Sequence, residues 1–269
     1  MEESNITRGG EFIIKETSPG NIFTPEDFSE EQKMMKQAVI DFIEKEVWPH
    51  RDRFEKKDFK LTEEVMRKAG ELGFLGIAVP EKYGGLGMGF VSTMLVCEYI
   101  SGCTGSLSTA FGAHTGIGTM PIVFYGTEEQ KQKYVPKLAS GEHFGSYCLT
   151  EPTAGSDANS GKTKAVLSED GTHYKISGQK IWISNAGFAN IFIVFARIED
   201  DKNISGFIVP NEPNNGISLG KEENKLGIHS SSTRQVFFDN TKVPIENMLS
   251  ERGNGFKIAL NSLNIGRIK

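Results

Sequence analysis

Two hydroxyl residues, Thr150 and Ser156, lie in the segment Tyr147–Asp157, whose composition suits a binding loop. The segment has the pattern of a strand end that runs into a tight turn. Pro152 fixes its own φ and Gly155 leaves φ free, so the backbone can curl and present N–H groups inward. Such a loop could hold a flat, polar-edged cofactor or a phosphate. On spacing alone, an Asx or Ser/Thr turn between two strands is the more ordinary interpretation.

A second candidate segment, Lys180–Gly187, places Trp182 on a strand just before the polar pair Ser184 and Asn185. A tryptophan on a strand is usually a core residue. Here Gly187 turns the chain after the polar pair, so one end of the strand could face a cleft. An aromatic wall beside a hydroxyl would hold a ring system.

Other reactive residue types have simpler explanations. Glu151 lies in a turn and is predicted to be structural, and His114, among small residues, is predicted to be a packed histidine. His143 and His229 have no partner at metal-ligand spacing, so the sequence predicts no metal site. An odd, sparse set of cysteines without C-x-x-C spacing indicates reduced thiols that fill the core. These cysteines are Cys97, Cys103 and Cys148.

The first half of the chain is expected to be helical. The spacings Ser29–Gln32 and Thr127–Gln130 are typical of capping boxes, and apolar residues recur at helical period behind the first of them. Further helices are expected at 91–101 and 106–124. The glycine-rich loop Val79–Gly87 is not a phosphate-binding fingerprint, because no strand-then-helix pattern surrounds it.

From about residue 144 the period changes to short strands separated by turn signals, which predicts an antiparallel sandwich or barrel. Asp170-Gly171 indicates a hairpin. After Pro244 the pattern becomes helical again and continues to Lys269. We therefore expect a tail (1–22), a helical domain (23–143), a β-domain (144–250) and the first helix (251–269) of a truncated C-terminal helical domain. This is a multidomain α+β organisation.

The overall composition argues against several classes of protein. The 269 residues carry a formal net charge of −5, which argues against a nucleic-acid binder. No apolar run is long enough to predict a membrane span. The acidic start resembles neither a secretory signal nor a transit peptide, so we expect a bacterial cytoplasm, or the mitochondrial matrix if the source is eukaryotic.

The two candidate segments together resemble the acyl-CoA dehydrogenase family. The resemblance rests on Leu149–Pro152, Gly155–Asp157 and Trp182–Asn185. Supporting stretches are Val79–Gly85, Gly126–Lys131, Tyr134–Glu142, Leu226–Thr233 and Val243–Asn247. The match extends from about Phe23 to the end of the chain.

The resemblance implies an N-terminal helical domain, a middle β-domain and a C-terminal helical bundle, with FAD between the last two. It assigns the flavin site to Tyr147, Leu149, Thr150, Gly155, Ser156, Trp182, Ile183 and Ser184. It assigns acyl-CoA contacts to Ser156, Asn264, Gly266 and Arg267. It also implies a homodimer or homotetramer, with an electron-transfer flavoprotein as electron acceptor.

The reaction implied is α,β-dehydrogenation of a fatty acyl-CoA thioester to the trans-2-enoyl-CoA, as in fatty acid β-oxidation. A carboxylate removes the α-proton while FAD takes the β-hydride. Isovaleryl-like members carry the catalytic Glu just before the helix Arg, where this chain has Gly266. Ser262–Arg267 looks most like the very-long-chain branch, so the base is expected beyond Lys269 and the 269 residues alone are expected to be inactive.

Two alternatives stay open at this point. One is a relative with the same fold and other chemistry, such as an acyl-CoA oxidase or a nitroalkane or aromatic monooxygenase. The other is a flavoprotein that serves as a non-catalytic binding module.

Overall fold

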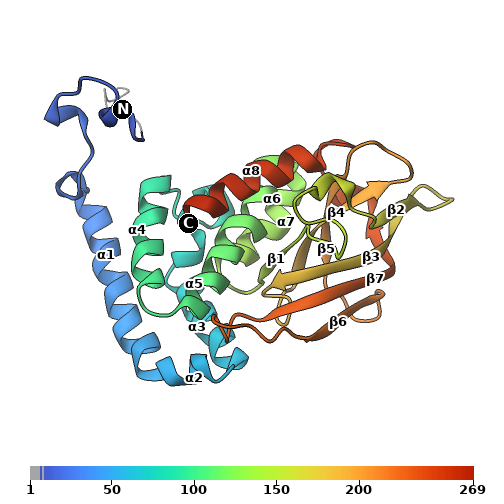
Figure 1. The fold of residues 1–269 in the computed structure, drawn as a ribbon, viewed down its shortest axis with the longest axis horizontal. Helices are drawn as coiled ribbons and strands as arrows, with labels where there is room; N and C mark the ends of the chain where they lie inside the picture. The colour runs from blue at the N-terminus through green and yellow to red at the C-terminus, as the bar shows by residue number, and fades with distance from the viewer. Residues whose placement is uncertain (1–6, 8) are drawn as a thin grey trace.

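The computed structural model describes residue 7 and residues 9–269, and the expected architecture is confirmed. Helices form one side of the molecule and a strongly bent sheet the other, with the last helix lying along the top of both in this view (Figure 1). The helices are α1 (Glu30–Phe42), α2 (Arg51–Glu55), α3 (Phe59–Glu71), α4 (Phe90–Ser101), α5 (Gly105–Gly112), α6 (Met120–Tyr125), α7 (Glu128–Ala139) and α8 (Gly255–Ile268). No helix in this part of the chain is both long and apolar enough to cross a membrane.

Both expected capping boxes form. The Ser29 hydroxyl accepts from the Gln32 N–H at 3.2 Å, and the Gln32 side chain accepts from the Ser29 N–H at 3.0 Å. Thr127 and Gln130 repeat the arrangement at the start of α7. These contacts satisfy backbone donors that a helix start leaves free, which explains why a local sequence pattern fixed both starts.

The single helix expected at 106–124 is divided. A π-helical segment, Ala113–Gly118, separates α5 from α6. Gly118 lies so close to β1 that a Cβ on it would come within 2.7 Å of the Gly145 carbonyl oxygen. The π-helical segment therefore packs directly against the first strand, which a regular helix with larger side chains could not do.

The β-domain is built from eight strands in the order β6-β7-β3-β2-β4-β5-β8, with β1 paired to β4 outside this path. The strands are β1 (Gly145–Cys148), β2 (Lys164–Leu167), β3 (His173–Ser184), β4 (Ile191–Ile198), β5 (Ser205–Pro210), β6 (Ile217–Glu222), β7 (Thr233–Pro244) and β8 (Met248–Leu249). Most pairs are antiparallel, as expected, and the predicted hairpin joins β2 to β3. The pairs β1–β4 and β2–β4 run parallel, which the sequence did not indicate.

Strand β4 is buried on both faces. Phe192 and Val194 pack inside the bent sheet with residues of β3 and β7, whereas Ile193 and Phe195 pack outward against the helices and α8. A strand between two apolar layers loses the polar alternation of a surface strand, which explains its continuous apolar sequence. This double burial joins the β-domain to the helices beside the candidate site.

His114 is the buried link between the π-helical segment and the β-domain. It is fully buried, its Nε2 lies 2.9 Å from the Leu138 carbonyl, and its Nδ1 accepts from the Gly145 N–H at 3.0 Å. Burial lowers the pKa of His114 to about 4. The prediction of a packed histidine is confirmed, and the three cysteines are likewise buried and unpaired.

We expect the stability of the protein to fall as pH drops from about 6.5 to 4, partly through His114. An unfolded histidine binds its proton near pH 6.5 and native His114 only near 4, so the unfolded state binds more protons in this window. The full effect is about 3 kcal/mol of unfolding free energy. Urea unfolding at pH 7 and pH 4.5 measures it for the wild type and for His114→Gln, which keeps one donor and one acceptor. An equal pH dependence in both proteins would contradict the prediction.

Candidate active site

One cavity of about 410 Å³ opens where β1, β3, α8 and the π-helical segment meet. All eight residues expected at the flavin line it: Tyr147, Leu149, Thr150, Gly155, Ser156, Trp182, Ile183 and Ser184. Of the residues expected to bind acyl-CoA, Ser156 and Arg267 line the cavity. The two candidate segments are about 30 residues apart in the chain, so the fold and not sequence proximity brings them together.

Asn264 and Gly266 lie on α8 but do not line the cavity. The Asn264 side chain accepts from Arg267 Nη1 at 2.7 Å. A Cβ added to Gly266 would lie 3.5 Å from Ile117 Cγ2. Both therefore adjoin residues of the cavity wall. Asn264 orients the Arg267 guanidinium, and Gly266 lies beside the π-helical segment with room for an ordinary van der Waals contact.

Six further wall residues escaped the sequence analysis. They are Ala113, Ile117, Ala158, Phe256, Leu260 and Leu263. The last three share a helical face with Arg267, at spacings of four, three and four residues, which a helical projection of the final segment could have detected. The wall is therefore apolar along α8 and polar along the loop after β1.

Trp182 owes its position to a bulge in β3. The register with β7 slips between Lys180 and Ile183, so β3 contains one extra residue there. Trp182 itself has a φ of +57°, a left-handed conformation that costs a non-glycine residue energy. Its side chain is 64 % exposed although it is large and aromatic. Bulges of this kind re-aim side chains at functional sites, and here the bulge turns the indole toward the cavity.

Thr150, Ser156 and Ser184 line the cavity, and their hydroxyls have no hydrogen-bond partner in the part of the chain that the structure describes. The Ser184 carbonyl, in contrast, accepts from Ser146 Oγ at 2.6 Å. Free hydroxyls beside an exposed indole can donate to or accept from the edge of a planar ligand. This combination fits a polar-edged ring system.

Ionisable groups are few in the wall. Tyr147 donates its hydroxyl proton to the Ala259 carbonyl at 3.1 Å and packs edge-on against Phe195 at 5.1 Å between centroids. Burial raises the pKa of Tyr147, so it stays protonated. No carboxylate lines the cavity among residues 7 and 9–269, and no group of three metal-ligating side chains occurs there. The described residues can hold a ligand but offer no acid–base pair.

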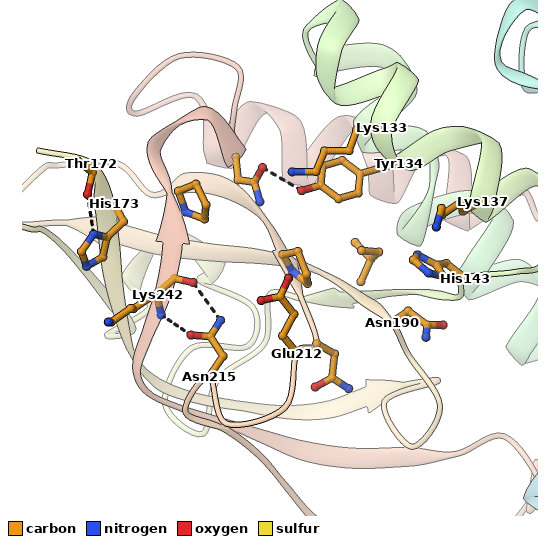
Figure 2. A pocket seen from close by; sticks show the side chains of 15 residues that line it. Lys133, Tyr134, Lys137, His143, Thr172, His173, Asn190, Glu212, Asn215 and Lys242 are labelled. Atoms are coloured by element: carbon orange, nitrogen blue, oxygen red, sulfur yellow. Dashed lines mark hydrogen bonds between the residues drawn. The ribbon is translucent and has the colours of Figure 1, made fainter.

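A larger cavity, of about 720 Å³, lies between α7 and the β-domain (Figure 2). Lys133 and Lys137 of α7 line one side of it, Lys242 lies on the β-domain side, and Glu212 lies between them. None of the residues expected at the flavin or the thioester lines this cavity. Its charged groups are exposed surface side chains, so volume alone does not make it the site of the chemistry.

The chain is similar to known proteins along both its helical part and its β-domain. Residues 29–142 match the family model for the acyl-CoA dehydrogenase N-terminal domain, and residues 146–241 match that for the middle domain. A probable acyl-CoA dehydrogenase of Bacillus subtilis is 50% identical over 267 residues, which is 99% of this chain and 44% of that protein. The very long-chain specific mitochondrial enzyme of Rattus norvegicus is 43% identical over 77% of this chain and 33% of its own length.

A crystal structure of an acyl-CoA dehydrogenase from Bacillus anthracis, complexed with FAD, superposes with a TM-score of 0.91 at 47% identity. The match covers 96% of this chain and 45% of that one. The chain thus spans less than half the length of these relatives.

Proposed function

The chain belongs to the acyl-CoA dehydrogenase family, and from this premise we propose that the whole protein uses FAD to dehydrogenate a fatty acyl-CoA between its α and β carbons. The observation that supports the proposal most is the single cavity lined by all eight residues expected at the flavin. FAD, when bound, supplies the hydride acceptor that protein side chains lack.

The residues of the cavity fit a flavin. Trp182 and Ile183 would flank the ring, and the free hydroxyls of Thr150 and Ser184 would bind its polar edge. Ser156, which also lines the cavity, would contact both the flavin and the acyl-CoA. Arg267, oriented by Asn264, would bind the polar part of the thioester ligand. The rest of the wall is apolar and would exclude water from the α-carbon.

The catalytic base is proposed to lie beyond Lys269. The only ionisable wall residues among those described are Tyr147 and Arg267, and neither removes a proton near neutral pH. A carboxylate placed in a dry site would have the raised pKa that this step needs. Residues 1–269 alone are accordingly expected to retain little FAD and to show no turnover, which a comparison of flavin content with the full-length protein tests.

The primary test is anaerobic titration of the full-length holoprotein with acyl-CoA thioesters. We expect the flavin absorbance to bleach with at least one chain length. Absence of bleaching across short, medium and long thioesters would refute dehydrogenation. Oxygen consumption with stoichiometric peroxide would instead identify an oxidase, and a downstream sequence without a Glu at the base position would favour a binding module.

The wider context is also proposed. The family resemblance makes an electron-transfer flavoprotein the expected acceptor and a homodimer or homotetramer the expected assembly. The bacterial relatives support the expectation of a bacterial cytoplasm, and the family resemblance implies a role in fatty acid β-oxidation. Reduction of a purified electron-transfer flavoprotein and the solution mass of the full-length protein test the first two points.

We propose a preference for long acyl chains and predict that Ala113→Leu reverses it. Ala113 and Ile117 line the cavity together with Leu260 and Leu263, and a larger side chain at 113 would occupy space for the distal carbons. The kcat/KM for a C16 thioester is expected to fall about 10-fold or more, with a small change for a C4 thioester, because one misplaced methylene has an effect of this size.

Gly112→Ala is the matched control, since a Cβ there would meet nothing within 4 Å. We expect it to leave both substrates unaffected. An equal loss of activity toward C4 and C16 thioesters in Ala113→Leu would show that this wall does not set chain length.

A further inference from the structure

A buried ammonium group lies behind the cavity, at Lys180. Its side chain is 1% exposed, and its Nζ contacts Phe195 O at 2.6 Å, Glu151 Oε1 at 2.7 Å and Leu149 O at 3.2 Å. Two of these oxygens belong to the loop that follows β1, and the third belongs to β4. Lys180 is therefore a bridge between β3, β4 and the loop that follows β1.

The three oxygens around Lys180 favour its charged form, whereas burial lowers the pKa of this lysine. All three neighbours are acceptors, and only an –NH₃⁺ group has three protons to donate, whereas a neutral amine would turn a lone pair toward one oxygen. Glu151 balances this charge and accepts in addition from the backbone N–H groups of Lys162 and Thr163. Burial raises the pKa of Glu151, but the Lys180 charge and these hydrogen bonds outweigh it and hold that pKa below its usual value.

The bridge fixes the peptide between Leu149 and Thr150. The Leu149 carbonyl is held by Lys180, so the Thr150 N–H of this trans peptide points away from Lys180. The Thr150 carbonyl is held from the other side by the Ile181 N–H at 2.9 Å. Leu149 and Thr150 both line the cavity. The rotation of the peptide between them therefore decides which of its backbone groups the cavity wall presents.

The same stretch of β3 carries the aromatic wall. Lys180 is directed inward and Trp182, two residues later, outward, because the bulge lies between Lys180 and Ile183. Ile181, between them, supplies the N–H that binds Thr150. The inward ammonium and the outward indole thus belong to one rigid unit that joins both candidate segments.

We propose that Lys180, charge-balanced by Glu151, is a positioning residue that presets the flavin-facing peptide Leu149–Thr150 before the cofactor binds. The proposal rests on the proposed function for the identity of the ligand, but not for the existence of the preset loop. An ion pair with only a structural role would stabilise the whole protein. Its loss would then change the loop only as far as it changes the overall stability. The two roles are therefore separable by experiment.

The experiment compares full-length wild type with Lys180→Met, with the double variant Lys180→Met/Glu151→Gln, and with Lys225→Met as control. Lys225 also donates to a backbone carbonyl, that of Ser231, but lies outside the cavity wall. Removing one partner leaves a buried charge unpaired, whereas neutralising both removes this penalty. The double variant should therefore recover much of the stability that Lys180→Met loses.

Three readouts are taken: thermal midpoint, FAD dissociation constant of the apoprotein, and hydrogen exchange in the apoprotein of the amides of residue 181 and of residues 150–154, where Pro152 has none. We expect the double variant to bind FAD at least about 10-fold more weakly than wild type, a change of about 1.4 kcal/mol. We also expect its 150–154 and 181 amides to exchange faster despite the recovered thermal midpoint. Lys225→Met should leave both properties at wild-type values.

Recovery of FAD affinity and exchange protection together with stability in the double variant would overturn the proposal and leave the pair a structural one. If Lys180→Met does not fold, the comparison of the double variant with wild type tests the proposal by itself. If wild type itself binds no FAD, the proposed function fails, whereas the exchange of the 150–154 amides in the apoprotein still supports or overturns the preset loop.

Discussion

Replacing Phe195 with alanine is expected to lower the free energy of unfolding by about 3–5 kcal/mol, the usual range for a phenylalanine removed from a core. Phe195 is 1% exposed and lies on the outward face of β4, packed with Ile258 of α8 and with the ring of Tyr147. The deleted ring leaves a cavity that the surrounding strands and helix cannot fill, because β4 is held by pairs on both edges.

Removal of the Phe195 ring should also disturb the candidate site. Tyr147 forms part of the cavity wall and is supported by Phe195 on one side and the Ala259 carbonyl on the other. We therefore expect weaker FAD retention in Phe195→Ala in addition to the lower stability. Equilibrium urea unfolding followed by circular dichroism measures the first effect, and flavin content after gel filtration measures the second.

Phe237→Ala provides the matched control for Phe195→Ala. Phe237 is the same residue type on β7 of the same sheet, but it is 36% exposed. The same truncation there should cost less, about 1–2 kcal/mol, because about a third of the residue stays exposed and less apolar area is lost. Similar losses at both positions would mean that β4 is not the central layer between the sheet and the helices.

Replacing Trp182 with alanine is expected to have the opposite profile, with a large effect on the flavin and almost none on stability. The indole is 64% exposed, so its removal takes little away from the core. If the indole flanks the flavin, losing its aromatic contact should weaken FAD binding about 10-fold, since aromatic contacts and the area they bury contribute on the order of 1–2 kcal/mol. Titration of the apoprotein with FAD, followed by flavin fluorescence, measures the change.

Two comparisons make the Trp182 result specific. Trp182→Phe keeps an aromatic face at the same left-handed backbone position and should restore most of the affinity. Trp48→Ala removes the only other tryptophan, which is 44% exposed in the helical half of the chain, and should change nothing at the flavin. Unaltered FAD affinity in Trp182→Ala would remove the indole from the proposed flavin site.

Several features of this protein could be predicted from the sequence because the interactions that decide them are local. The helix starts at Ser29 and Thr127 follow from side chains that bond backbone groups three residues away. The β2–β3 hairpin follows from Asp170-Gly171, where Gly171 adopts the positive φ that the turn needs. The division into a helical and a β-rich part follows in the same way from a change of hydrophobic period. The family motifs also selected eight residues that the fold brings to one cavity.

How these residues meet depends on long-range packing, which the sequence did not reveal. The parallel pairs of β4, the π-helical segment beside β1 and the bulge at Trp182 all depend on partners far along the chain. The same holds for Lys180, whose three oxygen partners lie 15 to 31 residues away. A lysine on a strand is ordinarily a surface residue, and no local pattern shows that burial is compensated by three acceptors. Local backbone preference fixes the elements, whereas the cavity and the charge behind it arise only when packing excludes water from between them.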